Sequence, residues 1–192
     1  MAVLKRRKAT RPKVFGIGFH KTGTTSLAVA LGQLGYRVTG PNGVHDPHIA
    51  DSYLAMCRKL ANQFDAFQDN PWPLVYREMD RLHPGSKFIL TLRESDEWLR
   101  SAVGYFGSKM TPMRELIYGY GAPVGHEERY VERFEQHNQD VLDYFKNRPH
   151  DLLVFRITEG EGWERLGRFL GAEVPSAAFP HAKPADGRSA AP

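Results

Sequence analysis

The sequence predicts an α/β fold in which a parallel sheet lies between two layers of helices. Short apolar runs typical of strands alternate along the 192 residues with segments whose apolar side chains recur at helical spacing. One run, KFILTL at residues 87–92, is apolar on both faces, as expected for a strand that is covered on both sides. A run ending at Gly18 is joined by a glycine-containing loop to a helical pattern over residues 24–35. Strand, loop and helix in this order favour a P-loop-like phosphate-binding fold, with ligands at the carboxyl ends of the strands.

The other elements continue this alternation. The remaining strands are predicted over residues 36–40, 64–69 and 151–157. The remaining helices are predicted over residues 46–62, 73–83, 95–106, 126–148 and 162–171. Asp46, and either Ser95 or Asp96, are expected to cap two of these helices. Residues 107–125 hold four glycines and two prolines and are predicted to form a long loop or a broken helix, of a kind that often carries function.

Length and charge indicate one domain with two irregular ends. The domain is predicted over residues 13–180, between a basic flexible N-terminus (1–12) and a mobile tail (181–192). The formal net charge is +4, but six residues supply +6 and leave about −2 elsewhere: Lys5, Arg6, Arg7, Lys8, Arg11 and Lys13. Such a local cluster is typical of a solvated terminus, with nucleic acid or an anionic surface as the alternative partner.

The chain carries no sequence sign of export or membrane insertion. Cys57 is the single cysteine, so no disulfide can form within the chain. No run approaches the roughly 20 apolar residues that a membrane-spanning helix needs. A soluble protein in the reducing cytoplasm is therefore expected, with a homodimer as the common default among assemblies.

The loop FHKTGTTSL at residues 19–27 departs from the loop of nucleoside triphosphatases. Gly18 and Gly23 have the spacing of G-x-x-x-x-G-K-[ST], but Thr24 stands where the lysine belongs and Lys21 lies inside the loop. Such enzymes also use an aspartate at the end of an apolar strand to help hold Mg²⁺, whereas the most apolar strand here ends in Arg93. Both departures argue against metal-dependent hydrolysis of a triphosphate, and no metal is expected.

Two motifs together resemble a known family. HKTGTTSL (20–27) resembles the 5′-phosphosulfate loop of sulfotransferases that use 3′-phosphoadenosine 5′-phosphosulfate (PAPS). LTLRESDEWLRSAV (90–103) resembles their 3′-phosphate motif, in which a strand-end arginine is followed eight residues later by a helical serine, here Arg93 and Ser101. The strand end and the second turn of the next helix converge on one phosphate, which accounts for this spacing. Alternatively, Arg93 pairs with a nearby glutamate and Ser101 only faces a neighbouring helix.

This resemblance implies roles for the loop residues. Lys21 would stabilise the charge that develops as 3′,5′-diphosphoadenosine (PAP) leaves. The N–H groups of residues 22–25, with the Thr24 and Thr25 hydroxyls, would hold the 5′-phosphate. The cofactor-binding set expected in the loop is Lys21, Thr22, Gly23, Thr24, Thr25 and Ser26. Arg93 and Ser101 would hold the 3′-phosphate, which distinguishes PAPS from ATP.

Relatives place a catalytic base, histidine or glutamate, near the end of a strand that precedes the arginine strand. Asp69 in QDNPW occupies the corresponding place and is the candidate base, although it could equally cap the helix that follows. His20 is the second candidate because it adjoins Lys21, with a backbone-bonded loop histidine as the alternative.

Recognition of adenine and of the 3′-phosphate departs from the family pattern. Relatives carry a tryptophan directly after Gly-Thr-Thr, where this chain has Ser26. Trp163, after a glycine turn, could cover the adenine instead, or could belong to the core. The late Arg-Lys-Gly element of relatives is absent, and Lys183 or Arg188 could replace it.

Two other groups of residues leave alternatives open. VHDPH (44–48) holds His45, Asp46 and His48, but Asp46 before proline favours a helix start over a metal site. The aromatics near the glycine-rich segment could line an acceptor pocket or fill the core: Tyr105, Phe106, Tyr118 and Tyr120.

The resemblance predicts an enzyme that moves a sulfuryl group from PAPS to a hydroxyl or amine of a small or glycan-like acceptor and releases PAP. Two alternatives keep the nucleotide site. One is a catalytically weak PAPS- or PAP-binding protein with a regulatory role, and the other is an ATP-dependent small-molecule kinase. A nucleic-acid binder acting through the basic N-terminus is a further alternative. The acceptor itself is not readable from the sequence.

Overall fold

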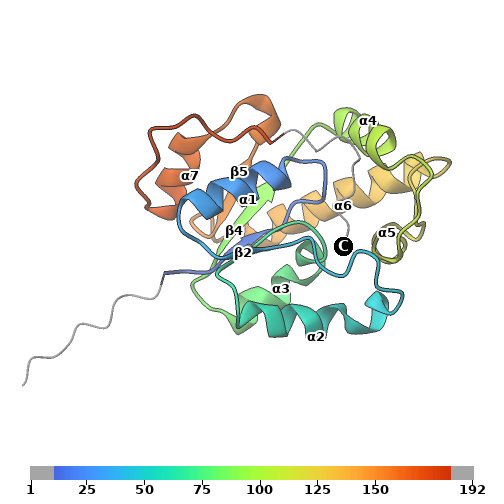
Figure 1. The fold of residues 1–192 in the computed structure, drawn as a ribbon, viewed down its shortest axis with the longest axis horizontal. Coiled ribbons are helices and arrows are strands. Elements are labelled where there is room, and N and C mark those ends of the chain that lie inside the picture. Colours follow the sequence, from blue (N-terminus) through green and yellow to red (C-terminus); the bar gives the residue numbers. More distant parts are fainter. Residues whose placement is uncertain (1–10, 183–192) are drawn as a thin grey trace, which may run out of the picture.

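The computed structural model describes residues 11–182 and has a five-stranded sheet between layers of helices (Figure 1). All four strand pairs of this sheet are parallel, so the predicted fold class is confirmed. The strands are β1 Val14–Gly16, β2 Val38–Thr39, β3 Ala66–Phe67, β4 Lys87–Thr91 and β5 Leu152–Phe155. Residues 1–10 and 183–192 lie outside the described range, and with them most of the predicted basic N-terminus and tail, including Lys183 and Arg188.

The strand order β2-β3-β1-β4-β5 places β1 at the centre of the sheet. Phe15 of β1 is in register with Phe67 of β3 and with Phe88 of β4. Because all the strands run in the same direction, the segments that follow β1, β3 and β4 emerge side by side at one edge. That edge carries most of the predicted site residues.

Seven α-helices surround the sheet within the described residues. They are α1 Thr24–Gln33, α2 Ile49–Ala61, α3 Trp72–Leu82, α4 Ser95–Phe106, α5 Pro112–Tyr118, α6 Glu127–Phe145 and α7 Trp163–Leu170. Figure 1 shows α1 and α7 on one face of the sheet and α2 and α3 on the other. Helix α6 also contributes to the second face through Val141 and Phe145, and with α4 and α5 it encloses a further apolar cluster around Phe19 and Trp98.

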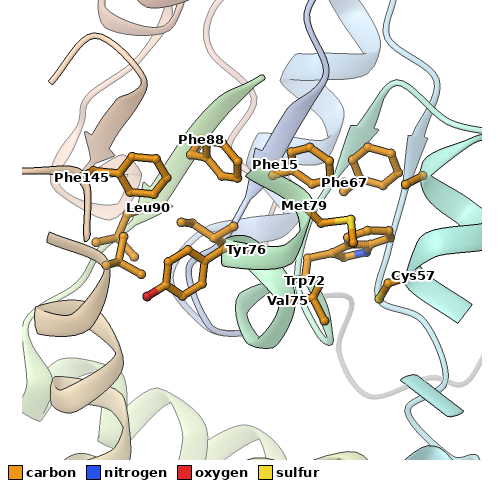
Figure 2. Packing of buried hydrophobic residues seen from close by; sticks show 13 residues of the cluster. Phe15, Cys57, Phe67, Trp72, Val75, Tyr76, Met79, Phe88, Leu90 and Phe145 are labelled. Carbon is orange, nitrogen blue, oxygen red and sulfur yellow. The ribbon is translucent and has the colours of Figure 1, made fainter. Parts of the chain in front are cut away.

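The side chains of the strands alternate between the two faces. Phe15 points into the cluster shared with α2, α3 and α6, where its ring stacks on Phe67 and Phe88 with centroids 4.6 and 5.4 Å away (Figure 2). Val14 and Ile89 point to the opposite face, against α1 and α7. Each fully buried large side chain contributes about 2 kcal/mol from apolar burial, so β1 is fixed from both sides. The loop that leaves β1 therefore starts from a rigid strand.

Some local predictions differ from the structure at helix starts. Helix α2 begins at Ile49 because Asp46 uses its carboxylate to accept hydrogen bonds from the His48 N–H (2.9 Å) and the Ser52 hydroxyl (3.2 Å), which holds a turn ahead of the helix. Helix α4 has Glu94 at its N-cap and no side-chain cap, so the expected cap by Ser95 or Asp96 is wrong.

The glycine-rich segment 107–125 contains the short helix α5. Thr111 caps this helix by accepting a hydrogen bond from the Arg114 N–H, and Gly119 ends it in the left-handed conformation. Helix α5 packs against α2 and α6, which places the segment beside the site edge of the sheet.

Candidate functional site

The site edge of the sheet brings three chain segments together. Strand β1 runs into the loop that ends at Gly23, β3 runs into Gln68–Asn70, and β4 runs into Arg93. Since β1 lies between β3 and β4, the loop is flanked by the other two segments. The sequence-predicted Lys21, Asp69 and Arg93 all lie in this region.

The loop is fixed by close contacts beneath it. A Cβ on Gly18 would lie 2.1 Å from Thr91 Oγ1, so only glycine lets β1 pass β4 at this point. The buried Thr22 hydroxyl donates to the Phe19 carbonyl (2.6 Å) and accepts from the Thr91 hydroxyl (2.6 Å). Lys21 and Gly23 turn the chain with φ of 66° and 99°. The loop therefore has its conformation before any ligand arrives.

The N-terminus of α1 is open toward an anion. Gly23 is its N-cap, and no side chain caps the first turn in the described chain. The N–H groups of Thr24, Thr25 and Ser26 come too early in the helix to have intrahelical partners. Together with the partial positive charge of a helix N-terminus, such groups bind phosphate.

Asp69 lies beside this N-terminus. Its Oδ2 accepts a hydrogen bond from the Thr24 hydroxyl (2.8 Å), and its Oδ1 accepts from the Asn70 N–H (2.7 Å). Its backbone is left-handed, with φ of 61°. Burial raises the pKa of Asp69, while the hydrogen bonds from Asn70 and Thr24 and the charge of Lys21 oppose the rise. The Thr24 hydroxyl, which the resemblance assigns to a phosphate, donates to this carboxylate in the structure.

The ammonium group of Lys21 is influenced by one positive charge, on Arg93, and one negative charge, on Asp69. Its Nζ lies 3.6 Å from the ring centroid of Tyr105, an exposed tyrosine of α4. Burial lowers the pKa of Lys21, the charge of Arg93 lowers it further, and Asp69 raises it. The charges of Asp69 and Arg93 thus both act on Lys21.

His20 points into the interior. Its Nδ1 is 2.9 Å from Asn70 Nδ2 and its Nε2 is 3.1 Å from the Tyr118 hydroxyl, so both ring nitrogens are engaged. Burial, with smaller effects from Arg114 and Lys21, lowers its pKa to about 3. Its carbonyl accepts from Trp98 Nε1 at 2.8 Å. A neutral His20 can accept a hydrogen bond from the side chain of Asn70, the neighbour of Asp69, and so helps to position it.

A family described as a sulfotransferase domain matches residues 13–127 and 104–187 of the chain. The chain belongs to this sulfotransferase family. It is also similar to "Ava biosynthesis cluster protein M" of Aspergillus versicolor, with 25% identity over 217 residues that cover 91% of this chain and 82% of that protein.

The arginine motif of this chain is partly exposed. The side chain of Arg93 retains 24% of its exposure, and its Nε lies 3.3 Å from Glu97 Oε2, one turn into α4. This is the pairing considered from the sequence as an alternative. Ser101 lies on α4, two turns beyond its start, and is half-buried. The two residues are carried by the same strand-to-helix connection that the motif predicts.

Trp163 and Ser26 both contact the C-terminal segment. Trp163 Nε1 donates to the Ala177 carbonyl (2.9 Å), and its ring packs edge-on against buried Phe179 with centroids 5.0 Å apart. Three residues later, the Ala182 N–H donates to Ser26 Oγ (3.1 Å). This C-terminal segment (177–182) therefore runs from α7 to the first turn of α1. Trp163 packs against the α1/α7 core cluster as well.

Other sequence candidates do not assemble with this site. His45 and His48 are exposed, and no group of three or more His, Cys, Asp or Glu in residues 11–182 is arranged to hold a metal. Trp72, Trp98 and Tyr118 are buried in the core, whereas Tyr105 and Tyr120 are exposed. Across the same range, no helix combines the length and apolar character needed to cross a membrane.

Sequence reasoning missed the supporting residues. Asn70, Tyr118 and Thr91 position His20 and Thr22 across long separations in the chain. Tyr105 was considered only as pocket lining or core, although its place one turn after Ser101 on α4 was readable. No local signal marks its contact with Lys21.

Proposed function

We propose that this sulfotransferase-family chain uses PAPS and transfers its sulfuryl group to a hydroxyl or amine of a small or glycan-like acceptor. The hydrogen bond from Thr24 to Asp69 carries this proposal. It sets a carboxylate with a raised pKa at the open N-terminus of α1, within the field of Lys21. A carboxylate whose pKa is raised by burial, placed beside the proposed phosphate site, is suited to take a proton from an acceptor bound there.

The residues of the site fit such a nucleotide. The first-turn N–H groups of α1 and the loop N–H groups of Thr22 and Gly23 would bind the 5′-phosphate, and Arg93 with Ser101 would bind the 3′-phosphate. PAPS would supply an activated sulfuryl group on a good leaving group. Lys21 would donate to the bridging oxygen, which gains negative charge as the bond between sulfur and that oxygen breaks. Ser26 and Trp163 would contribute near the nucleoside, through the C-terminal segment that both contact.

Asp69 would act as the general base. The acceptor oxygen or nitrogen forms the new bond to sulfur while its proton passes to the Asp69 carboxylate, so the leaving nucleotide departs with the negative charge. His20 is the weaker candidate because its two ring nitrogens are bonded to Asn70 and Tyr118. A reducing cytoplasmic setting fits the free, buried thiol of Cys57.

The cofactor is tested by calorimetric titration of metal-free protein with PAP and with ADP in parallel. We expect micromolar binding of PAP and much weaker binding of ADP. Arg93→Ala should remove most of the preference for PAP, while Arg100→Ala, at an exposed position of the following helix α4, leaves it intact. Equal affinities for PAP and ADP in the unmodified protein would refute the assignment of PAPS.

The base is tested by Asp69→Asn, since asparagine tolerates the left-handed backbone at this position. With PAPS and an acceptor found by screening phenols, alcohols and amines, we expect turnover to fall about a hundredfold or more while the PAP affinity changes little. Asp51→Asn, on the exposed surface of α2, serves as control. Unchanged turnover in Asp69→Asn would exclude Asp69 as the base.

One observation favours an ATP-dependent kinase as the second candidate. Asp69 follows β3, the neighbour of β1, and a nucleotide kinase would need a carboxylate there to help hold Mg²⁺. A kinase would bind ADP with a requirement for Mg²⁺ and would be indifferent to a 3′-phosphate, so the same titration separates the two functions.

A further inference from the structure

A cavity of about 350 Å³ lies on the α3 and α6 side of the sheet, and two of its lining residues, Arg133 and His137, contact Phe19 and Ile17 ahead of the loop residues assigned to the nucleotide. Helices α2, α3, α5 and α6 all contribute to its lining. None of the lining residues belongs to the loop, to Asp69 or to the Arg93 motif. It is therefore a separate hollow in the surface.

The cavity holds an arginine without an acceptor. Arg133 of α6 is half-buried, and among the described residues it has neither a hydrogen bond nor an ion pair. Its guanidinium carbon lies 5.2 Å from the ring centroid of Phe19, and burial lowers its pKa. The guanidinium of Arg133 has donors that no described protein group accepts, and its partial burial leaves it less hydrated than an exposed arginine. An oxyanion in the cavity would satisfy it.

The charge of the lining sets the charge of the ligand. Arg77 and Arg133 are cationic, and Asp140 is the single acidic residue of the lining. His137 is neutral, because its Nε2–H donates to the Ile17 carbonyl (2.7 Å) and burial lowers its pKa to about 4. The excess is one positive charge, which one negative charge balances.

The remaining lining is mainly apolar. Tyr53, Leu74 and Leu116 are half-buried side chains that pack on the neighbouring core clusters. We propose that this cavity is a binding site for a small molecule that joins one singly charged oxyanion, a carboxylate or a sulfate monoester, to an aromatic or branched aliphatic body. The oxyanion pairs with Arg133, and the body lies against Tyr53 and the two leucines.

The experiment uses ¹⁵N-labelled full-length protein and three probes that share a benzene ring: benzoate, phenyl sulfate and neutral benzyl alcohol. We expect at least one of the two anions to shift the Arg133 Nε–H signal and the α6 amides saturably, and the tighter one identifies the oxyanion. Benzyl alcohol should cause no saturable shift at Arg133. Anion shifts confined to the amides of residues 22–26 would mean that the probes only occupy the phosphate loop, and would overturn the proposal.

Variants of the charged lining residues should change the anion affinity in opposite directions. Arg133→Gln should weaken binding of the anion about tenfold, whereas Arg129→Gln, one turn earlier and paired with Glu132, should change it less than about twofold. Asp140→Asn should tighten binding about threefold, because it removes the one negative charge of the lining. Since Asp140→Asn keeps the side-chain shape, it remains informative if Arg133→Gln folds poorly. Equal affinities in Arg133→Gln and Arg129→Gln, or no tightening in Asp140→Asn, would contradict the assignment.

Discussion

The two motifs that we propose for phosphate binding lie at the ends of neighbouring strands but are built differently. On the loop side, which comprises residues 17–20 and 22–26 with Asp69, the buried Thr22 hydroxyl is hydrogen-bonded and Gly18 leaves no room for a side chain. The arginine side comprises Arg93, Glu97 and Ser101. Its guanidinium is partly exposed and forms an ion pair with Glu97. The loop side is held by its own contacts, whereas Arg93 on the arginine side would have to leave Glu97 to bind a phosphate.

Because of this difference, we expect the loop side to determine the affinity for a nucleotide and the arginine side to determine which nucleotide is preferred. A preorganised loop loses little entropy on binding and can supply most of the affinity for any 5′-phosphate. On the arginine side, a phosphate contact replaces the exposed ion pair between Arg93 and Glu97, which stabilises the protein by about 0.5 kcal/mol. The net gain in binding free energy is the difference between these two interactions. Discrimination between nucleotides should therefore be easier to alter than nucleotide binding itself.

The largest expected effect is from acid, because both strongly shifted histidines lie beneath the loop side. Burial keeps His20 and His137 neutral with pKa values of about 3 and 4, whereas the unfolded chain protonates them near pH 6.5. The unfolded state then binds more protons, so stability is complete above pH 6.5 and falls as the pH falls toward 4. Between pH 7.5 and pH 5 we expect a loss of about 4 kcal/mol in the free energy of unfolding, about 2 from each histidine.

Urea unfolding at several pH values measures this loss. His20→Gln should lower the stability at pH 7.5 but remove about half of its pH dependence between pH 7.5 and 5. The same pH dependence in that variant would show that His20 is not held neutral. Carboxylates with a lowered pKa, such as Asp80, titrate below this range and do not account for it.

The next effect comes from breaking the loop side sterically. Gly18→Ala would place a Cβ 2.1 Å from Thr91 Oγ1 and 2.3 Å from the Thr91 carbonyl oxygen, so β1 and β4 would have to separate. We expect a loss of about 3 kcal/mol in the free energy of unfolding and weaker PAP binding. Gly32→Ala, with open space around the Cβ position, is the matched control and should not destabilise the protein. Equal stability of the two variants would mean that the loop side is not tightly packed.

Lys21 stands between the two sides. Lys21→Met keeps the alkyl stem but removes the ammonium, so we expect turnover to fall about a hundredfold with a small change in PAP affinity. The exposed Lys59→Met of α2 serves as control. A loss that appeared only as weaker binding would make Lys21 a phosphate anchor and place it with the loop side.

The smallest expected effect is a change in PAP affinity when the ion pair of Arg93 is removed. Glu97→Gln frees Arg93 from its exposed partner, so calorimetry should give about twofold tighter PAP binding and no change for ADP. Glu164→Gln removes an exposed ion pair of the same spacing on α7 and should change neither. Weaker PAP binding in Glu97→Gln would mean that Glu97 orients the arginine and does not compete for it.

The predictable part of the site is the part encoded locally. Glycine spacing placed the loop between β1 and α1, and the strand pattern placed Asp69 and Arg93 at the edge of the sheet. The contact between Thr22 and Thr91 joins residues 69 positions apart, and that between Tyr118 and His20 joins residues 98 apart. Such contacts depend on how helices pack, which periodicity does not determine. For the same reason the helix starts shifted at Asp46 and Glu94, where one side chain or one turn decides the boundary.

Lys21 and Asp69 share an uncommon backbone conformation, with φ of 66° and 61°. The left-handed region costs a residue with a side chain about 1 kcal/mol, and more for lysine than for aspartate, whereas glycine adopts it freely. A laboratory selection for heat resistance alone would therefore favour glycine at both positions. The selected variants would be more thermally stable and would lack the ammonium and the carboxylate on which the proposed chemistry depends. At these two positions the natural sequence accepts a thermodynamic handicap that folding by itself does not demand.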